Sequence, residues 1–373
     1  MKVFDTIVIG GGLAGSSTAL HLAKYGHKVL VLEKYENNRI IPCAGGMASS
    51  MQKFIPIDIK EAVETEVKSV FFTWKASDQV IAELSGDSPF WIVKREKLNN
   101  ILINAAIING AEIKYSTTVK SIKNNGGDWI INSNDKNIYK SSFLVIADGS
   151  DSLWSSYLSL GPKYPRYAKT AALKLSGIGN LKKDSVRFDF GAIKYGFAWA
   201  FPLKEFVNVG IGTFIGNTKL EEINHIKSIL KTFGFKGTEF KLINQKLRIW
   251  NGIHKLHNEG VLVVGDAASL CDPFLAEGIR PALISSYYAA KCIDECISTK
   301  SKDLTDYSRI MKEKWSNSMV WGKRIAEVFY RFPKTGYNLG IKRKTAPKRI
   351  AQILSGEMSY SDIAKRVIKR FLF

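Results

Sequence analysis

Three glycines near the start of the chain have the spacing of a turn that binds dinucleotides. Gly10, Gly12 and Gly15 form a G-x-G-x-x-G pattern within the segment GGGLAG. The first glycine permits a tight turn, the second lets the backbone approach a pyrophosphate, and the third lets helix and strand pack closely. Glu33 ends the next apolar run, where a carboxylate can bind ribose hydroxyls. These residues predict a dinucleotide site.

The elements around the glycines are those that such a site requires. Residues 3–9 alternate as a strand, residues 13–26 have a helical apolar period, and residues 28–33 form a continuously apolar strand. A helix that begins at the glycines points its free N–H groups and its positive dipole end toward the phosphates. The strand–helix–strand context therefore favours a dinucleotide site over an accidental glycine-rich turn.

Two later segments also place an aspartate at the end of a buried strand. They are FLVIADGSDS at 143–152 and VLVVGDAASLCDPFLAEGIRPAL at 261–283. Open α/β sheets bind ligands at this carboxyl edge. In the second segment, Asp266 can accept hydrogen bonds from sugar-like hydroxyls, and Gly278 begins a helix whose N-terminus can stabilise negative charge. Three separated segments thus converge on one ligand.

A thiol stands in the loop IIPCAGGM, residues 40–47, directly after this opening unit. Pro42 stiffens the loop next to Cys43, and Gly45 and Gly46 allow a backbone to approach something closely. Cys43 has two interpretations. It is either a small apolar residue buried in a tight turn or a thiol held against a cofactor.

The remaining cysteines give no sign of a metal site. Cys271, Cys292 and Cys296 lack paired metal-ligand spacing, and the last two lie one turn apart on an expected helix, where core packing explains them. Sparse, unpatterned cysteines fit a reducing compartment. We expect a cytoplasmic protein without a metal.

The charge distribution predicts an acidic partner. The net charge is +20, and residues 301–373 hold 17 Lys/Arg against 6 Asp/Glu, which is +11 of that total. Anionic lipid, an acidic electron-donor protein and nucleic acid fit this surface, and a merely solvated, lysine-rich surface is the alternative. The sequence has no zinc pattern, RNA-binding aromatic signature or helix-turn-helix cue, so we expect no nucleic acid.

Membrane contact is expected only from the surface. No signal-peptide pattern precedes the first strand, and no uninterrupted apolar run of about 18 residues occurs. The final residues, SDIAKRVIKRFLF, place apolar residues among basic ones and, if helical, resemble an amphipathic anchor lying in the membrane surface. A helix that packs on its own domain is the alternative.

The three ligand segments, in this order, resemble the FAD fingerprints of the flavin-dependent hydroxylase superfamily. Three places narrow the resemblance to the geranylgeranyl reductase family. PCAGGM is similar to its Cys-Gly-Gly loop, YGFAWAFPLKEFVNVGIG at 195–212 to its Y-x-W-x-F-P segment, and GDAASLCDPFLAEGI to its G-D motif. The resemblance spans about residues 3–300.

Four positions depart from the family pattern. Phe197 replaces a tyrosine, Lys194 a proline, Ala44 a glycine, and Trp154 the arginine that usually ends the D-G motif. Loss of a phenol removes a hydrogen-bonding tip but keeps apolar bulk. These four departures therefore bear on which substrate is bound more than on whether the flavin is bound.

The resemblance implies FAD as the cofactor and assigns residues to it. The residues implied to bind FAD are Gly10, Gly12, Ala14, Gly15, Glu33, Ala44, Arg95, Val119, Asp266, Gly278 and Ile279. Within this set, the resemblance implies that Arg95 binds phosphate, that the backbone of Val119 contacts adenine, and that Asp266 binds the ribityl chain. The residues implied on the substrate side are Phe197, Trp199, Phe201 and Pro273, whereas Arg280 is expected to point away from the site.

The implied activity is FAD-dependent reduction of isoprenoid, geranylgeranyl-type carbon–carbon double bonds, with hydride from N5 of the reduced flavin and the proton delivered near Cys43. The aromatic residues at 188–201 fit an apolar tunnel for an isoprenoid or prenylated lipid, and the core of a β-sheet is their alternative. Because only one dinucleotide motif is present, NADPH that docks transiently or a small acidic iron–sulfur protein would donate electrons. A monooxygenase (hydroxylase) of an apolar substrate and a non-catalytic, flavin-bound, membrane-associated factor are the rival functions.

The expected fold is α/β, with a Rossmann-like FAD-binding domain assembled from separated segments, an antiparallel β-sheet substrate domain and a helical C-terminal region. The FAD-binding domain is assigned to 1–67, 91–165 and 255–300, the substrate domain to 68–90 and 166–254, and the basic helical region to 301–373.

Overall fold

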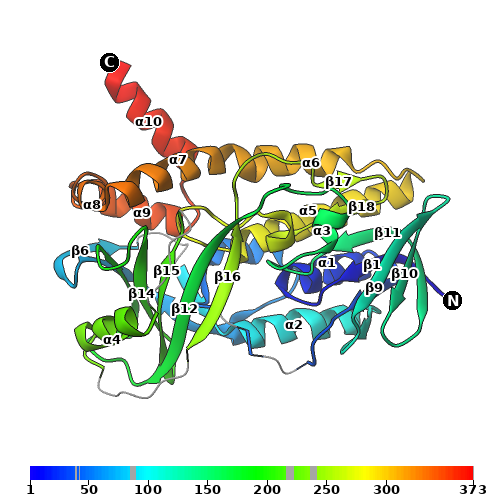
Figure 1. The fold of residues 1–373 in the computed structure, drawn as a ribbon, viewed down its shortest axis with the longest axis horizontal. Helices are drawn as coiled ribbons and strands as arrows, with labels where there is room; N and C mark the ends of the chain where they lie inside the picture. The colour runs from blue at the N-terminus through cyan, green and yellow to red at the C-terminus, as the bar shows by residue number, and fades with distance from the viewer. Residues whose placement is uncertain (38–39, 42, 85–89, 216–221, 236–241, 373) are drawn as a thin grey trace.

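The computed structural model describes residues 1–37, 40–41, 43–84, 90–215, 222–235 and 242–372. Its first sheet has eight strands and contains the opening strand–helix–strand unit (Figure 1). The central strands are parallel and run in the order β18-β11-β1-β2-β8, with β17 antiparallel at one edge. Their bounds are β1 Lys2–Ile9, β2 Val29–Leu32, β8 Glu112–Lys114, β11 Ile138–Ile146, β17 His257–Asn258 and β18 Val261–Val263.

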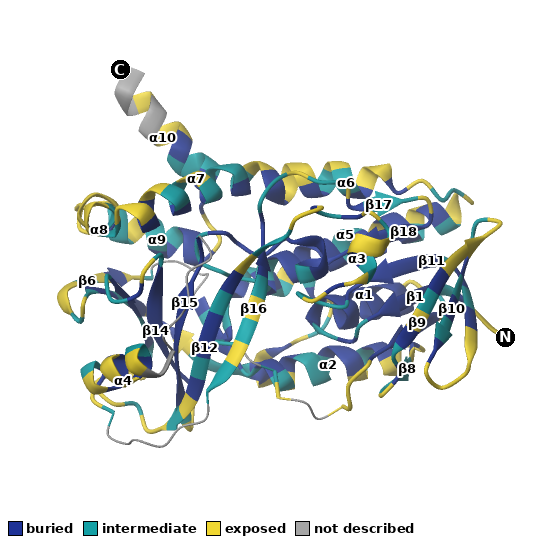
Figure 2. Ribbon diagram, viewed as in Figure 1, coloured by how far each residue is buried: buried dark blue, intermediate teal, exposed yellow. Residues whose placement is uncertain are grey.

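One layer of helices covers this sheet. Helix α1 (Leu13–Lys24) packs between α2 (Arg95–Ile108) and α5 (Ile279–Ser298). The antiparallel strands β9 (Val119–Asn125) and β10 (Asp128–Ser133) extend the sheet from β11. Burial is greatest in α1, in β2 and β18, and in the C-terminal halves of β1 and β11, as the dark blue in Figure 2 shows, whereas β8 has no fully buried residue. Burial on both faces explains why β2 is apolar at every position.

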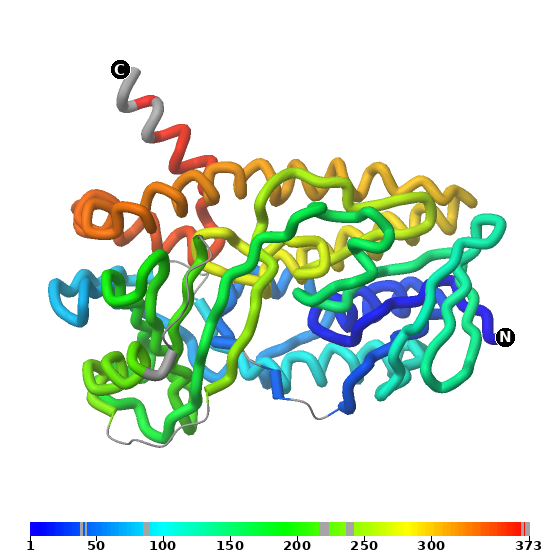
Figure 3. Tube along the Cα trace, viewed as in Figure 1, coloured from blue at the N-terminus to red at the C-terminus, as the bar shows by residue number. Residues whose placement is uncertain are grey.

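A second sheet of seven strands has the order β16-β12-β15-β14-β13-β5-β6, and all its pairs are antiparallel except β13–β5. The bounds are β5 Ser69–Trp74, β6 Ser77–Glu83, β12 Arg166–Ser176, β13 Ser185–Phe190, β14 Gly196–Pro202, β15 Phe206–Thr213 and β16 Ile243–Ile249. Strands β5 and β6 come before β8 in the chain. In Figure 3 the chain can be followed as it leaves the first sheet after β11, adds β12 to β16 to the second sheet and returns to the first sheet at β17.

Strand β14 is buried on both faces, and its sequence reflects two different neighbours. Its even-numbered residues, Ala198 and Ala200, pack in the cluster that includes Ile226 and Ile229 of α4 (Glu222–Thr232). Its odd-numbered residues are aromatic and belong to the cluster on the opposite face. Because successive side chains of a strand point to opposite faces, small residues fit under the helix and large ones fill the other side.

A third, three-stranded sheet consists of β3 (Gly46–Ala48), β7 (Phe90–Val93) and β4 (Val63–Val67), in the order β3-β7-β4. Short helices, η1 (Ser49–Phe54) and η2 (Lys60–Ala62), connect its strands. The sequence did not predict this sheet. It fixes the end of the Cys43 loop, because β3 begins three residues after the cysteine.

The C-terminal region is helical, as expected. Its elements are α6 Thr305–Met311, the π-helical turn η4 Lys312–Ser316, α7 Asn317–Arg331, α8 Pro333–Gly340, α9 Ala346–Leu354 and α10 Tyr360–Leu372. Helix α10 projects away from the body of the molecule (Figure 1). The α/β class, with a β-rich second sheet and a helical C-terminal region, is confirmed.

Candidate FAD and substrate site

One cavity of about 790 Å³ is lined by both large sheets. Fourteen of the sixteen predicted site residues line it: Gly10, Gly12, Ala14, Glu33, Cys43, Ala44, Arg95, Val119, Phe197, Trp199, Phe201, Asp266, Gly278 and Ile279. The other two, Gly15 and Pro273, are buried but are not part of the lining. A Cβ on Gly15 would lie 1.8 Å from the carbonyl oxygen of Gly10, so this glycine serves the close packing of α1 on the turn.

The glycine turn and Glu33 form one unit at the end of β1. Gly10 has φ +102°, a conformation that favours glycine, and a Cβ there would lie 2.3 Å from the carbonyl oxygen of Ala147. One carboxylate oxygen of Glu33 accepts a hydrogen bond from Gly11 N–H at 2.6 Å, and the other accepts from Tyr35 N–H at 2.9 Å. The carboxylate thereby fixes the turn while it faces the cavity.

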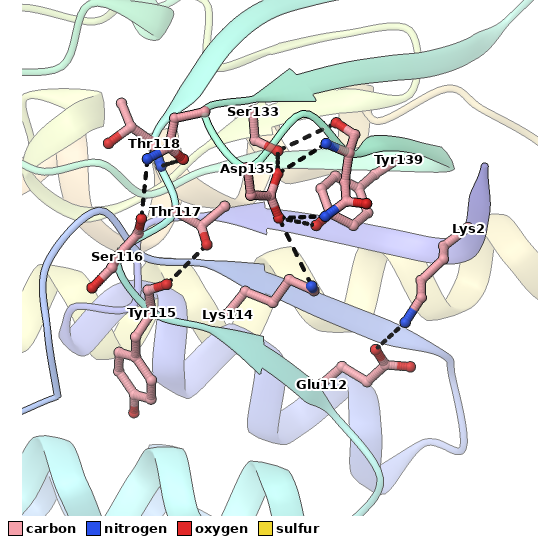
Figure 4. A network of polar contacts seen from close by, with 12 residues as sticks. Lys2, Glu112, Lys114, Tyr115, Ser116, Thr117, Thr118, Ser133, Asp135 and Tyr139 are labelled. Carbon is pink, nitrogen blue, oxygen red and sulfur yellow. Dashed lines mark hydrogen bonds and ion pairs between the residues drawn. The ribbon is translucent and has the colours of Figure 1, made fainter.

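A hairpin turn fixes the backbone that leads into Val119. The Asn134 side chain accepts a hydrogen bond from Thr118 N–H at 2.8 Å and donates to the carbonyl oxygen of Ser116 at 3.2 Å (Figure 4). Burial alone would raise the pKa of the adjacent Asp135, but its hydrogen bonds hold that pKa well below its usual range. Those hydrogen bonds come from Ser133, Asn137 and Tyr139. The network presents Thr117, Thr118 and Val119 to the cavity.

Three charged groups, Arg95, Asp148 and Asp266, also line the cavity. Arg95 is the first residue of α2, and its Nη1 has no hydrogen-bond partner within the described chain. The same holds for Oδ1 of Asp148, which follows β11. Burial raises the pKa of Asp266 to about 6, although the positive charges of Arg95 and Arg248 act against that rise. These groups are arranged for a ligand with both anionic and hydroxyl groups.

Cys43 lies half-buried in the same cavity. Its Sγ accepts a hydrogen bond from Gly45 N–H at 3.3 Å. Gly45 has φ +82°, and a Cβ there would lie 2.3 Å from the carbonyl oxygen of Val93. Burial raises the pKa of the Cys43 thiol, and the nearby charge of Arg95 offsets only part of that rise. The thiol is therefore neutral at neutral pH.

A buried asparagine connects Cys43 to the aromatic wall. Asn208 on β15 donates from Nδ2 to the carbonyl oxygen of Cys43 at 3.3 Å, and its Oδ1 accepts from Trp199 Nε1–H at 2.8 Å. Gly210 makes room for the indole, because a Cβ there would lie 2.2 Å from the Trp199 ring. Asn208 lies inside the segment 195–212 but is not among the residues predicted for the site.

We expect Asn208→Ala to lower the free energy of unfolding by about 1–3 kcal/mol, because it leaves the buried Trp199 N–H without a partner. Urea unfolding of the apoprotein, followed by tryptophan fluorescence, measures the change. Asn132→Ala is the matched control, since that side chain donates a hydrogen bond to Ser121 Oγ at 2.8 Å and neither residue lines the cavity. An equal or smaller loss in Asn208→Ala than in the control would contradict the proposed bridge.

Aromatic rings form the apolar wall of the cavity. Phe188 lies 5.3 Å from Phe201 and 5.4 Å from Phe197, and Phe197 lies 4.8 Å from Phe214, all measured between ring centroids. Behind them, Tyr330 of α7 packs 5.6 Å from Phe214 and so closes this end. Phe190 belongs to the same cluster but is not part of the cavity lining.

The described residues fit FAD. A dinucleotide needs backbone N–H groups and a cation at its diphosphate, hydroxyl partners at its sugars, and an apolar surface for its ring system. The turn at Gly10–Gly12, the unpartnered Arg95 nitrogen, the carboxylates of Glu33 and Asp266 and the aromatic wall supply these in one cavity. The described residues contain no group of His, Cys, Asp and Glu that could hold a metal ion.

The lining also contains polar residues that had not been assigned a role. Asp148 lies in the D-G segment and Glu277 in the segment GDAASLCDPFLAEGI, so both could have been selected from the sequence, whereas Thr117 carried no sequence signal. Glu277 pairs with Arg280 at 3.1 Å, and Arg280 donates to the carbonyl oxygens of Ile353 and Leu354 of α9. Arg280 thus holds the C-terminal region against the site.

Comparisons with known proteins identify relatives along nearly the whole chain. A family model described as FAD dependent oxidoreductase matches residues 5–39. The digeranylgeranylglycerophospholipid reductase of Thermoplasma acidophilum is 28% identical over 348 residues, covering 89% of this chain and 85% of that protein. A geranylgeranyl bacteriochlorophyll reductase-like protein of the same organism superposes with a TM-score of 0.80 at 22% identity, covering 95% and 92% of the two chains. A halogenase in complex with FAD superposes with a TM-score of 0.70 at 16% identity, covering 88% and 76%.

Proposed function

We propose that this chain, an FAD-dependent oxidoreductase related to the geranylgeranyl reductases, reduces carbon–carbon double bonds in the isoprenoid chains of a lipid. One observation carries the proposal: a neutral thiol, an aromatic wall and the residues that fit FAD line a single cavity. The relatives named digeranylgeranylglycerophospholipid reductase support the same substrate class.

FAD, when bound and reduced, supplies a hydride. Arg95 and the N-terminus of α1 would hold its diphosphate, and Asp266 its ribityl hydroxyls. The aromatic wall, with Phe188, Phe197 and Phe201, would align the apolar chain and exclude water. Cys43 would release the proton from Sγ to the alkene carbon that does not receive the hydride, and solvent would then restore the thiol.

The deciding experiment supplies a lipid with geranylgeranyl chains to dithionite-reduced protein without oxygen. We expect a mass gain of two hydrogens for each reduced double bond. In D₂O both added hydrogens should be deuterium, because dithionite supplies only electrons and the hydrogen on flavin N5 comes from the solvent. Oxygen-dependent insertion of oxygen instead would establish the monooxygenase. A bound flavin that turns over neither with nor without oxygen would establish the non-catalytic factor.

The charge of the chain bears on the choice between the two candidate electron donors. A net charge of +20 favours a small acidic iron–sulfur protein over transient docking of NADPH. Reduction of the flavin by such a protein should then slow steeply with rising salt, whereas reduction by NADPH should respond much less.

An anionic membrane surface is the second partner in the proposal. No helix in the described part of the chain is long and apolar enough to span a membrane. However, Val328 and Phe332 at the end of α7 and Leu339 on α8 are more than half exposed. Residues 328–356 contain seven basic residues and no acidic one. Helix α10 would add to this surface, but most side chains of its expected apolar stripe, at 367–368 and 371–372, lie outside the described residues.

Phe332→Ser should weaken binding to anionic vesicles several-fold, because it removes the largest exposed apolar side chain of this surface. Phe332 is 64% exposed, and Ile108 on α2, 84% exposed, gives the control variant Ile108→Ser. Co-sedimentation with vesicles that contain phosphatidylglycerol, at low and high salt, measures the effect. Equal binding to neutral and anionic vesicles would refute the electrostatic part of the proposal, and equal binding of the two variants would refute the assigned surface.

A further inference from the structure

A fully buried arginine lies behind the cofactor loops and is not used by the proposed reaction. Arg248 on β16 has 0% of its surface exposed. Its Nη1 donates to Ser155 Oγ at 2.8 Å and to the carbonyl oxygen of Ala267 at 3.2 Å. Its Nε and Nη2 have no hydrogen-bond partner within the described chain.

These two hydrogen bonds join the loops that carry the site's aspartates. Ser155 belongs to α3 (Trp154–Tyr157), which follows the D-G segment with Asp148. Ala267 belongs to the short helix η3 (Gly265–Ala268), which contains Asp266. Arg248 itself belongs to the seven-stranded sheet, so its side chain connects that sheet to both loops.

The charges around Arg248 are predominantly acidic. Burial lowers the pKa of Arg248, whereas Tyr167, Asp148 and Asp266 act to raise it. Asp266 in turn faces charged and titratable groups on several elements: Arg95 of α2, Arg248 of β16, the thiol of Cys271 and the N-terminus of α5 at Gly278. Arg95 lines the cavity and is available to a ligand, whereas Arg248 is behind the wall.

A residue needed only for packing would not be an arginine here. A buried guanidinium with unpaired N–H groups costs free energy, and well-packed apolar residues usually replace buried charges at no loss of stability. An arginine at this position therefore indicates that a buried positive charge is needed here. The negative charges of Asp148 and Asp266 account for that need.

We infer that Arg248 is a positioning residue for the cofactor: its guanidinium holds α3 and η3 together and supplies the buried positive charge that balances Asp148 and Asp266. The inference rests on FAD as the cofactor. It does not depend on which substrate is reduced, so failure of the proposed reductase activity would leave it standing.

The affinity for FAD should depend on pH through the protonation of Asp266. Asp266 binds hydroxyl groups best as a carboxylate, so affinity should fall as the pH drops through the pKa of Asp266, about 6. Removing the positive charge of Arg248 favours the protonated acid. The loss of affinity should then begin at higher pH.

The test measures the Kd of apoprotein for FAD by flavin fluorescence from pH 5.5 to 9. In Arg248→Met, the inflection should move up by about one pH unit, and binding at pH 9 should be about tenfold weaker because the loops are no longer joined. Arg248→Lys should keep the inflection of the unmodified protein but still bind about tenfold more weakly at pH 9, since an ammonium keeps the charge but not the planar fork.

Two further variants separate positioning from general destabilisation. Arg187→Met removes a partly buried arginine that acts on Asp189, does not line the cavity and is not among the charges that act on Asp266, so it should leave the inflection unchanged. In an Asp266→Asn background the inflection should be absent, and adding Arg248→Met should not restore it. An unchanged inflection in Arg248→Met, or an equal shift in Arg187→Met, would overturn the charge role. If Arg248→Met does not fold, Arg248→Lys decides, because FAD binding equal to the unmodified protein at every pH would overturn the joining of the loops.

Discussion

Gly12→Val is expected to yield folded, colourless protein that contains no FAD. Gly12 is the N-cap of α1, with φ −70°, a conformation that valine adopts without strain. The residue lines the cavity, so an isopropyl group there would stand where the diphosphate approaches the backbone. The ratio of flavin to protein absorbance measures the loss, and circular dichroism checks that the variant is folded.

The neighbouring glycines cannot give this information. A Cβ on Gly10 or Gly15 would collide with backbone oxygens at 2.3 and 1.8 Å, so variants there would disturb the fold itself. Gly340→Val on α8 is a suitable control, because a Cβ there makes only ordinary contacts, near 3.9 Å. Yellow Gly12→Val protein with a normal flavin content would remove the basis for placing the dinucleotide at this turn.

Local patterns predicted the opening of the fold because neighbouring residues determine it. The alternation of β1, the helical period of α1 and the apolar run of β2 each reflect burial against the same core, and the glycines between them follow from the turn. Helix α5 likewise begins directly after Gly278, where the sequence predicts a helix start, since its apolar stripe and its first-turn proline are local signals.

Contacts between segments that are far apart in the chain could not be predicted from local sequence patterns. Asn208 and Cys43 are 165 residues apart in the chain. No pattern of residue spacing predicts a hydrogen bond between an asparagine on a strand and a carbonyl oxygen in such a distant loop. Arg248 was passed over for the same reason. In QKLRI it resembles any polar residue of an alternating strand, and only the closure of the two sheets buries it.

The aromatic residues of β14 show why one pattern left two interpretations open. A tunnel wall and a sheet core both place large apolar side chains on alternate positions. In the structure, Phe197, Trp199 and Phe201 line the cavity and also pack in a core cluster with the C-terminal helices. The two interpretations describe the same side chains, because the wall of an apolar cavity is itself part of the core.

Cys43 also had two interpretations, a small residue that fills a tight turn or a thiol held against the cofactor, and its surroundings favour the second. The thiol lines the cavity and belongs to a loop that is fixed from two sides, by Gly45 N–H at Sγ and by Asn208 at the carbonyl oxygen. A small residue that only filled a turn would not need a cavity position. The neutral thiol, within the same cavity as the predicted flavin residues, is suited to deliver a proton.

Cys43→Ser is therefore expected to leave the FAD content unchanged and to slow reduction of the substrate by pre-reduced protein by about 100-fold or more. Serine nearly preserves the size of the side chain and can still accept the hydrogen bond from Gly45 N–H. Its hydroxyl is a far weaker acid than a thiol, so it gives up its proton much less readily. Anaerobic single-turnover measurements isolate this step from reduction of the flavin and from product release.

Cys296→Ser is the matched control, because the Cys296 thiol already donates to the carbonyl oxygen of Asp303 at 3.1 Å and a hydroxyl can do the same. Its single-turnover rate should equal that of the unmodified protein. If Cys43→Ser turns over as fast as the control, the thiol only fills the turn, and the proton comes from another source, most simply water.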